Sequence, residues 1–293
     1  MHRLILHNDE IREADAGLLS PGQVGLLSGW GVFSTLRVSG GVLFAFERHW
    51  ARMQRDAALL RVPLPESVEW LRSRLLALVE ANGAQNATLR VAVVRNLGGM
   101  WAGPGIKREW DLIGLTTALK DWGTGVRLAV QPQARHAANP FAGTKILSWA
   151  MNLAWVEAAN FRGFDEVVLL NERDEVSECT SANIFIARGN EVWTPPLSSG
   201  CLPGVTREIL LEEIHVPGIR IGEKVLRLAD LESSDEVFIT SSTRDLLSVD
   251  EVEGLAIQRG SAIRNALSRD FRKYVSYYVA AHRSEAELPA KTR

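Results

Sequence analysis

Two short runs of mostly apolar residues near the start of the chain have the composition of β-strands. Residues 32–38 (VFSTLRV) are rich in β-branched and aromatic side chains, and residues 42–46 (VLFAF) form a second such run. Only Ser39, Gly40 and Gly41 separate the two runs. Two strands joined through a Gly-Gly turn are typical of a β-hairpin, and we expect one here.

Helix-like and strand-like patterns interleave along the rest of the chain. Apolar residues at helical spacing predict helices over 47–60, 66–81, 148–161 and 205–214. Short runs of β-branched and apolar residues predict strands over 88–94, 111–119, 126–130, 165–170, 183–187, 191–194 and 236–240. Interleaved helices and strands predict a mixed α and β (α/β) fold.

A polar, glycine-containing segment divides the chain. Residues 120–125 (KDWGTG) have the composition of a linker. We therefore expect a smaller N-terminal α/β domain over 1–119 and a larger C-terminal domain over 126–282. Residues 283–293 are mostly charged and small, which predicts a disordered tail.

Composition narrows the class of protein. The 293 residues are 46% hydrophobic and 23% charged, as in ordinary globular proteins. The formal net charge is -2, so the protein has no overall positive charge that would attract nucleic acid. No run approaches the roughly 18 apolar residues of a membrane span. The two cysteines, Cys179 and Cys201, are too few for a disulfide framework, so we expect a cytoplasmic protein without nucleic-acid or membrane partners.

Two residues of the second half could take part in chemistry. Lys145 stands in a mostly apolar stretch (GTKILS), and a lysine in a poorly hydrated pocket can attack carbonyl carbons. The alternative is an ordinary solvated lysine. Glu178 lies among small residues before a strand, where a carboxylate could keep a pyridine nitrogen protonated. The alternative is a turn carboxylate that accepts hydrogen bonds from nearby backbone N–H groups.

Two further segments could bind phosphate. Pro203-Gly204 precedes the helix predicted from Val205, and the free N–H groups of a first helical turn attract anions. The hydroxyl of Thr206 would add a donor. Residues 240–243 (TSST) bring four hydroxyl groups to the end of a predicted strand. Plain polar turns remain the alternative at both places.

These motifs, in this order, resemble those of the fold-type IV pyridoxal-5′-phosphate (PLP) enzymes. That family, the class IV aminotransferases, includes branched-chain aminotransferases, D-amino-acid aminotransferases and aminodeoxychorismate lyases. SGCLPGVTRE is similar to the family's LPG-hydrophobic-TR motif, and EVSECTSANIFIA to its E-x-x-x-x-N-hydrophobic-F segment. GWGVFSTLRV, FERHWARM and DEVFITSSTRDLLSV resemble three other family segments. The resemblance runs from about Asn8 to about Val249.

The resemblance implies PLP as the cofactor, no metal, and a role for each matching residue. Lys145 would form the Schiff base with PLP and move the substrate proton, and Glu178 would hold the protonated pyridine nitrogen. The residues implied to bind the cofactor phosphate are Arg52, Val205, Thr206 and Ser242. The implied fold is the two-domain D-amino-acid-aminotransferase-like fold with PLP between the domains, in at least a homodimer.

The resemblance also suggests which substrates to expect. We predict a PLP-dependent aminotransferase that transfers an amino group between a branched-chain-like amino acid and a 2-oxo acid. Arg90 stands where branched-chain enzymes have an arginine and could bind a carboxylate. Phe33 and Trp101 could line an apolar pocket.

Departures from the family pattern leave two alternatives open. Trp30 and Ser34 replace acidic residues that are common in the family, near the substrate side. The alternatives are a D-amino-acid aminotransferase and an aminodeoxychorismate lyase, which eliminates pyruvate. A lyase substrate carries a second acidic group, and Arg95 is the candidate for its cation.

Overall fold

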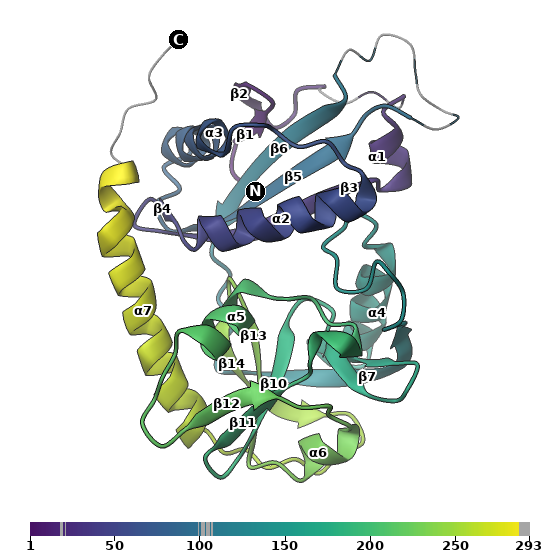
Figure 1. Cartoon of the computed structure of the whole chain (residues 1–293), viewed down its shortest axis with the longest axis vertical. Helices are drawn as coiled ribbons and strands as arrows, with labels where there is room; N and C mark the ends of the chain where they lie inside the picture. The colour runs from purple at the N-terminus through teal and green to yellow at the C-terminus, as the bar shows by residue number, and fades with distance from the viewer. Residues whose placement is uncertain are drawn as a thin grey trace. The chain divides into compact units, whose positions relative to one another are not determined.

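The computed structural model describes residues 1–17, 20, 22–98, 100, 103, 106 and 108–286 (Figure 1). The chain divides into two compact units. Unit 1 comprises Met1–Lys120, Lys145–Trp149 and Val275–Arg293, and unit 2 comprises Asp121–Thr144 and Ala150–Tyr274. Both units contain helices and strands, so the mixed α and β class predicted from the sequence is confirmed.

Unit 1 is built on an antiparallel sheet with the strand order β2-β1-β6-β5-β3-β4. Its strands are β1 (Leu4–His7), β2 (Glu10–Glu13), β3 (Gly31–Ser39), β4 (Val42–Leu43), β5 (Ala87–Arg95) and β6 (Trp110–Ala118). Its helices are α1 (Val24–Ser28), α2 (Phe46–Leu60) and α3 (Val68–Ala81). Helix α2 packs against β3, and α3 packs against β1 and β6 (Figure 1).

The predicted hairpin is present between β3 and β4. Gly40 and Gly41 have φ angles of 56° and 81°, a left-handed backbone that glycine adopts without strain. The second strand is shorter than the expected 42–46. Ala45 also has a positive φ of 52°, which turns the chain out of the sheet and into α2.

One face of the unit 1 sheet forms its hydrophobic core. Alternate residues of β3 and β5, among them Leu36 and Val91, point toward the helices. Trp50 and Met53 of α2 and Leu75 of α3 close this core. The other face therefore carries the side chains at the intervening positions, which include Phe33 and Arg90.

Unit 2 contains a mixed sheet with the strand order β12-β11-β10-β13-β14-β7-β8-β9. The strands are β7 (Gly125–Arg135), β8 (Glu166–Asn171), β9 (Val176–Cys179), β10 (Asn183–Arg188), β11 (Glu191–Thr194), β12 (Arg220–Glu223), β13 (Glu236–Ser241) and β14 (Asp245–Val252). The helices are α4 (Ala150–Phe161), η1 (Leu197–Ser199), α5 (Val205–Glu212) and α6 (Leu228–Glu232). Strand β7 runs parallel to both of its neighbours, β14 and β8.

The C-terminal part of the chain holds elements that the sequence patterns did not predict. Strand β14 follows β13, and helix α7 covers Ala262–Ala286. Helix α7 includes residues 283–286, which we expected in the tail, whereas 287–293 lie outside the described residues. No helix in the described ranges combines the length and apolar character that a membrane crossing requires.

Candidate active site

Lys145 belongs to unit 1, although it lies beyond the linker expected at 120–125. The N–H of Phe33 donates to the carbonyl of Lys145 (3.1 Å), and the N–H of Leu147 donates to the carbonyl of Gly31 (3.0 Å). An antiparallel bridge joins Val32 to Ile146. The lysine segment therefore extends the unit 1 sheet along the first half of β3.

Two cations approach the ring of Phe33. The amine of Lys145 lies 4.6 Å from the ring centroid, and the guanidinium of Arg90 lies 4.0 Å from it. Burial lowers the pKa of Arg90. Among the described residues, no hydrogen bond or ion pair engages the Arg90 guanidinium. Three predicted site residues, Phe33, Lys145 and Arg90, thus lie together on this face of the sheet, and two of them are cationic.

The buried face of α2 carries His49 and Arg52, both almost fully enclosed. The hydroxyl of Ser34 on β3 lies 2.8 Å from Nδ1 of His49 and accepts a hydrogen bond from Arg52 (3.0 Å). Burial, together with the charges of Arg52 and Lys145, lowers the pKa of His49 well below its usual value. His49 is therefore neutral at pH 7, which allows its Nδ1 to accept a hydrogen bond from the Ser34 hydroxyl beside the buried cation of Arg52.

Glu178 lies on β9 in unit 2 and is buried. One carboxylate oxygen accepts a hydrogen bond from Nε of Arg135 (3.0 Å), and the other accepts the backbone N–H of Leu202 (3.0 Å). Arg135 also donates to the side chain of Asn152 (3.2 Å). These contacts fix Glu178 next to the loop that leads into α5.

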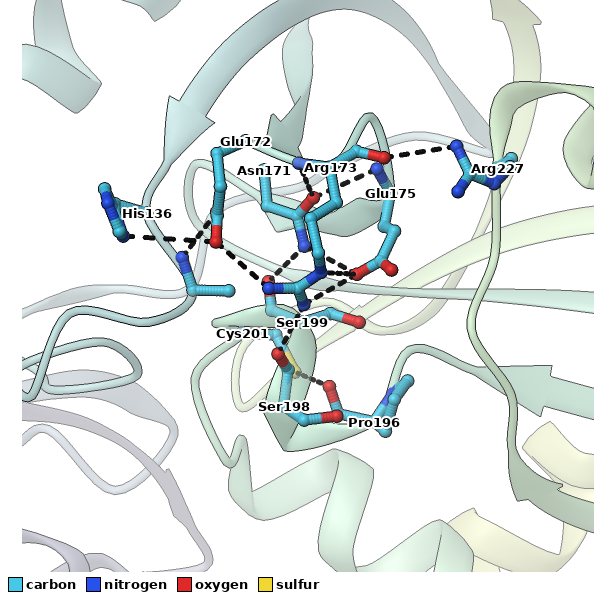
Figure 2. Close-up of polar contacts among 11 residues, drawn as sticks. His136, Asn171, Glu172, Arg173, Glu175, Pro196, Ser198, Ser199, Cys201 and Arg227 are labelled. Carbon is cyan, nitrogen blue, oxygen red and sulfur yellow. Dashed lines mark hydrogen bonds and ion pairs between the residues drawn. The ribbon is translucent and has the colours of Figure 1, made fainter.

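A polar cluster in the β8–β9 turn anchors that loop (Figure 2). The side chain of Asn171 donates to the carbonyl of Ser199 (3.3 Å), and Arg173 donates to the carbonyl of Ser198 (2.9 Å). Both side chains also donate to Glu175, and the hydrogen bond from Arg173 lowers the pKa of that carboxyl. These hydrogen bonds hold the loop that precedes α5 against the β8–β9 turn.

The start of α5 has the features of an anion site. A Cβ at Gly204, the N-cap, would lie 2.0 Å from the side-chain oxygen of Asn183, so a larger residue there would force Asn183 to move. The N–H groups of Val205 and Thr206 lie in the first turn, where a helix offers no internal acceptor. The Thr206 side chain is only 2% exposed, and its hydroxyl has no hydrogen-bond partner in the described part of the chain. An unpartnered buried donor at a helix start fits a bound phosphate.

Ser242 lies in the turn between β13 and β14, and a buried ion pair holds this turn. Arg244 contacts Glu166 at 3.2 Å, with side-chain exposures of 7% and 2%. Arg244 also donates to the carbonyl of Ser181 (3.1 Å) and lies 3.8 Å from the ring centroid of Trp122. The hydroxyl-rich turn is therefore tied to the segment that follows Glu178.

Several residues of the site were not identified from the sequence. The H-x-x-R pair of α2 drew attention to Arg52, but Asp56, one turn further along the same buried face, was overlooked. Arg135 carries no local signal, because it meets Glu178 only through the pairing of β7, β8 and β9. Trp101, a predicted substrate residue, lies outside the described residues.

The motifs and the fold agree with what comparison with known proteins finds. The family model described as Amino-transferase class IV matches residues 31–252, and the protein belongs to this family of enzymes. The resemblance inferred from the motifs is thus confirmed.

Individual relatives differ in the reaction that their names describe. A Methanocaldococcus jannaschii protein, provisionally named a branched-chain-amino-acid aminotransferase, is 28% identical over 87% of this chain and 89% of its own length. The D-alanine aminotransferase of Bacillus licheniformis is 26% identical over 88% of this chain and 91% of its own length.

The fold is also found in solved structures of the family. One is from Legionella pneumophila and is provisionally named a 4-amino-4-deoxychorismate lyase. It superposes with a TM-score of 0.81 at 22% identity, covering 89% of this chain and 96% of that one. At that identity the likeness concerns the fold alone, and it bears out the predicted fold.

Proposed function

We propose that the protein is a PLP-dependent aminotransferase that moves an amino group between a branched-chain-like amino acid and a 2-oxo acid, with PLP attached to Lys145. The observation that carries this proposal is that the Lys145 amine and the Arg90 guanidinium lie 4.6 Å and 4.0 Å from the centroid of one ring, that of Phe33. An amino acid presents a reacting carbon next to a carboxylate. A lysine beside a fixed cation suits both groups.

The residues present fit PLP. Class IV aminotransferases depend on this cofactor, and the unpartnered Thr206 hydroxyl at the start of α5 suits its phosphate. Glu178 would hold the ring nitrogen of PLP. The further residues that we propose for the phosphate are Arg52, Val205 and Ser242. When bound, PLP supplies an electron sink for the bonds at the substrate Cα.

The chain's own groups would then divide the work. The amine of Lys145 would take the proton from the substrate Cα as a general base and donate it to C4′ of the cofactor as a general acid. Arg90 would hold the carboxylate and so set the orientation of the Cα–H bond. Phe33 would keep water away from the amine, and its edge contact with Trp149 (6.5 Å between centroids) extends this apolar wall.

A lyase that acts on aminodeoxychorismate is the second candidate, and the contacts of Arg95 count against it. Nε of Arg95 donates to the carbonyl of Leu97 (2.8 Å), and another of its nitrogens donates to the carbonyl of Arg61. The guanidinium also lies 4.2 Å from the ring centroid of Trp30. A cation engaged in this way is poorly placed to receive the second acidic group of such a substrate.

We further propose a cytoplasmic homodimer. The family resemblance implies a dimer, and α4 offers apolar side chains for a second copy. Met151, Leu153 and Phe161 are 67%, 57% and 87% exposed. Cys179 and Cys201 are both buried and unpaired, which suits a reducing compartment.

One experiment tests cofactor, attachment site and reaction together. The PLP-loaded protein is mixed with L-leucine, L-valine or D-alanine, and absorbance and 2-oxo acid release are followed. We expect conversion to the pyridoxamine form with L-leucine or L-valine, and borohydride reduction before mixing should leave a mass adduct on Lys145. A response to D-alanine alone would point to a D-amino-acid enzyme. Pyruvate release from aminodeoxychorismate without any amino-acid response would replace the transaminase with the lyase.

A further inference from the structure

Asp56 contributes a buried carboxylate to the surroundings of Lys145. It lies on α2, one turn beyond Arg52, and is only 1% exposed. Oδ2 accepts the backbone N–H of Lys145 at 2.9 Å, and Oδ1 accepts Nε of Arg55 at 2.9 Å. Neither the motifs nor the proposed function gives this carboxylate a role.

The hydrogen bond from the Lys145 N–H to Asp56 holds the backbone of the lysine on a second side. The carbonyl of Lys145 accepts the N–H of Phe33 on β3, while its own N–H is bound by Asp56 on α2. Both backbone polar groups of Lys145, the N–H and the carbonyl, are therefore held, each by a different element of unit 1. Helix α2 is itself embedded in the core through Trp50 and Met53, so the carboxylate has a firm support.

We propose that Asp56 is a positioning residue, which holds the Lys145 backbone so that the amine stays beside Phe33 and Arg90. The inference rests on the proposed function of Lys145. A buried carboxylate is costly unless donors surround it, and a hydrogen bond to an ionised acceptor is roughly twice as strong as a neutral one. Because a reacting amine must be held closely, a misplacement of about 1 Å can cost about 100-fold in rate.

The side chains of Asp56 and Arg52 also share one face of α2. Arg52 is proposed to bind the phosphate of the cofactor, and Asp56 holds the residue to which the other end of the cofactor attaches. A single rigid helix would therefore set the spacing between these two contacts. Loosening Asp56 should disturb Lys145 while leaving Arg52 in place.

The first measurement is amide hydrogen exchange at Lys145, which needs neither cofactor nor turnover. In Asp56→Ala we expect this amide to exchange about 10- to 100-fold faster than in the wild type, because its acceptor is gone. Asp56→Asn keeps an oxygen for the Lys145 N–H, and Arg55, whose side chain is 41% exposed, can turn to water. In Asp56→Asn the exchange rate of the Lys145 amide should therefore stay within about 3-fold of the wild-type rate. If the alanine variant does not fold, Asp56→Leu, a better filler of the space, takes its place.

Asp111 supplies the matched control. It is also a buried carboxylate of unit 1, but its hydrogen bonds within the described ranges come from other side chains, among them that of Asn96 (2.8 Å), and none from the lysine segment. Asp111→Ala should lower stability without changing exchange at Lys145. Equal acceleration in both alanine variants would mean general loosening and would overturn the positioning role.

The second measurement uses the PLP-loaded enzyme. Asp56→Ala should lower kcat about 10- to 100-fold with the KM of the amino donor within about 3-fold, and Asp56→Asn should restore most of kcat. Unchanged exchange and kcat in Asp56→Ala, with PLP bound to Lys145 in the wild type, would overturn the inference. Faster exchange in Asp56→Ala, with no PLP attached to wild-type Lys145, would instead refute the proposed function and leave the backbone contact established.

Discussion

The guanidinium of Arg90 lies 4.0 Å from the centroid of the Phe33 ring, on the sheet face opposite to α2. Burial lowers the pKa of Arg90, so an arriving anion would stabilise its charge. Arg90→Gln is expected to raise the KM of the amino donor roughly 10- to 100-fold, about 1.4 to 3 kcal/mol, for the loss of a charged hydrogen bond. Steady-state kinetics with L-leucine measures this effect.

Arg95→Gln is the matched control, because it removes a guanidinium that already has carbonyl partners. It should change the same KM by less than about 3-fold, since less than about 0.7 kcal/mol would be lost. The assignment of the carboxylate to Arg90 fails if Arg95→Gln has the larger effect.

Thr206→Val should change stability and cofactor affinity in opposite directions. The buried hydroxyl has no partner in the described part of the chain, so removing it should raise the unfolding free energy of the cofactor-free protein by up to about 1 kcal/mol. The same change removes a donor to phosphate and should weaken PLP binding about 10-fold. Thermal unfolding and PLP titration measure the two effects.

Thr194→Val offers a contrast to this change. Its hydroxyl is equally buried but donates to the carbonyl of Ile184 (2.8 Å). The valine should therefore cost about 1 kcal/mol of stability and leave PLP affinity unchanged. A PLP affinity that Thr206→Val does not alter would exclude this hydroxyl from the phosphate site.

The ion pair between Arg244 and Glu166 is deeply buried within unit 2. Arg244→Met should destabilise the protein by about 3 to 5 kcal/mol, because it leaves the Glu166 charge buried without its partner. Adding Glu166→Gln should recover part of that loss. Urea unfolding of the single and double variants measures the coupling.

The pair between Arg220 and Glu191 is the exposed counterpart, with side-chain exposures of 81% and 44%. Arg220→Met should cost less than about 1 kcal/mol. Similar losses in Arg244→Met and Arg220→Met would contradict a special role for the buried pair.

His49 predicts a pH dependence of stability. Its pKa is lowered in the folded protein, so the unfolded chain, with a histidine pKa of about 6.5, binds a proton that the folded chain does not. This contribution is fully present above the unfolded pKa, and it is lost as the pH falls below about 6.5, by up to about 1.4 kcal/mol per pH unit. His49→Gln should flatten the profile between pH 7 and pH 5, measured by urea unfolding.

The exposed His215 provides the comparison for this profile. His215→Gln should follow the wild-type profile, because this side chain lies at the surface, outside the buried cluster of His49, Arg52 and Ser34. Parallel profiles for wild type and His49→Gln would show that His49 is not held neutral.

Local sequence determined the features that need only neighbouring residues. The Gly40-Gly41 hairpin, helix α2 and the Pro-Gly entry to α5 were all predicted, since turn glycines and apolar periodicity act over a few positions. The LPGVTR motif and the order of the other motifs were sufficient to indicate the family. Strand β14 and helix α7 were not predicted. Strand β14 is defined by its pairing with β13 and β7, and most of the stability of a helix in a protein comes from tertiary packing.

Tertiary structure alone decided which of the chemical residues meet. Lys145 lies 112 positions after Phe33 in the sequence, and only the pairing of its segment with β3 brings the two together. The contact of Asp56 with the Lys145 amide and that of Arg135 with Glu178 likewise join separate elements. Such contacts depend on how sheets and helices pack, a long-range choice that no local pattern of residue types encodes.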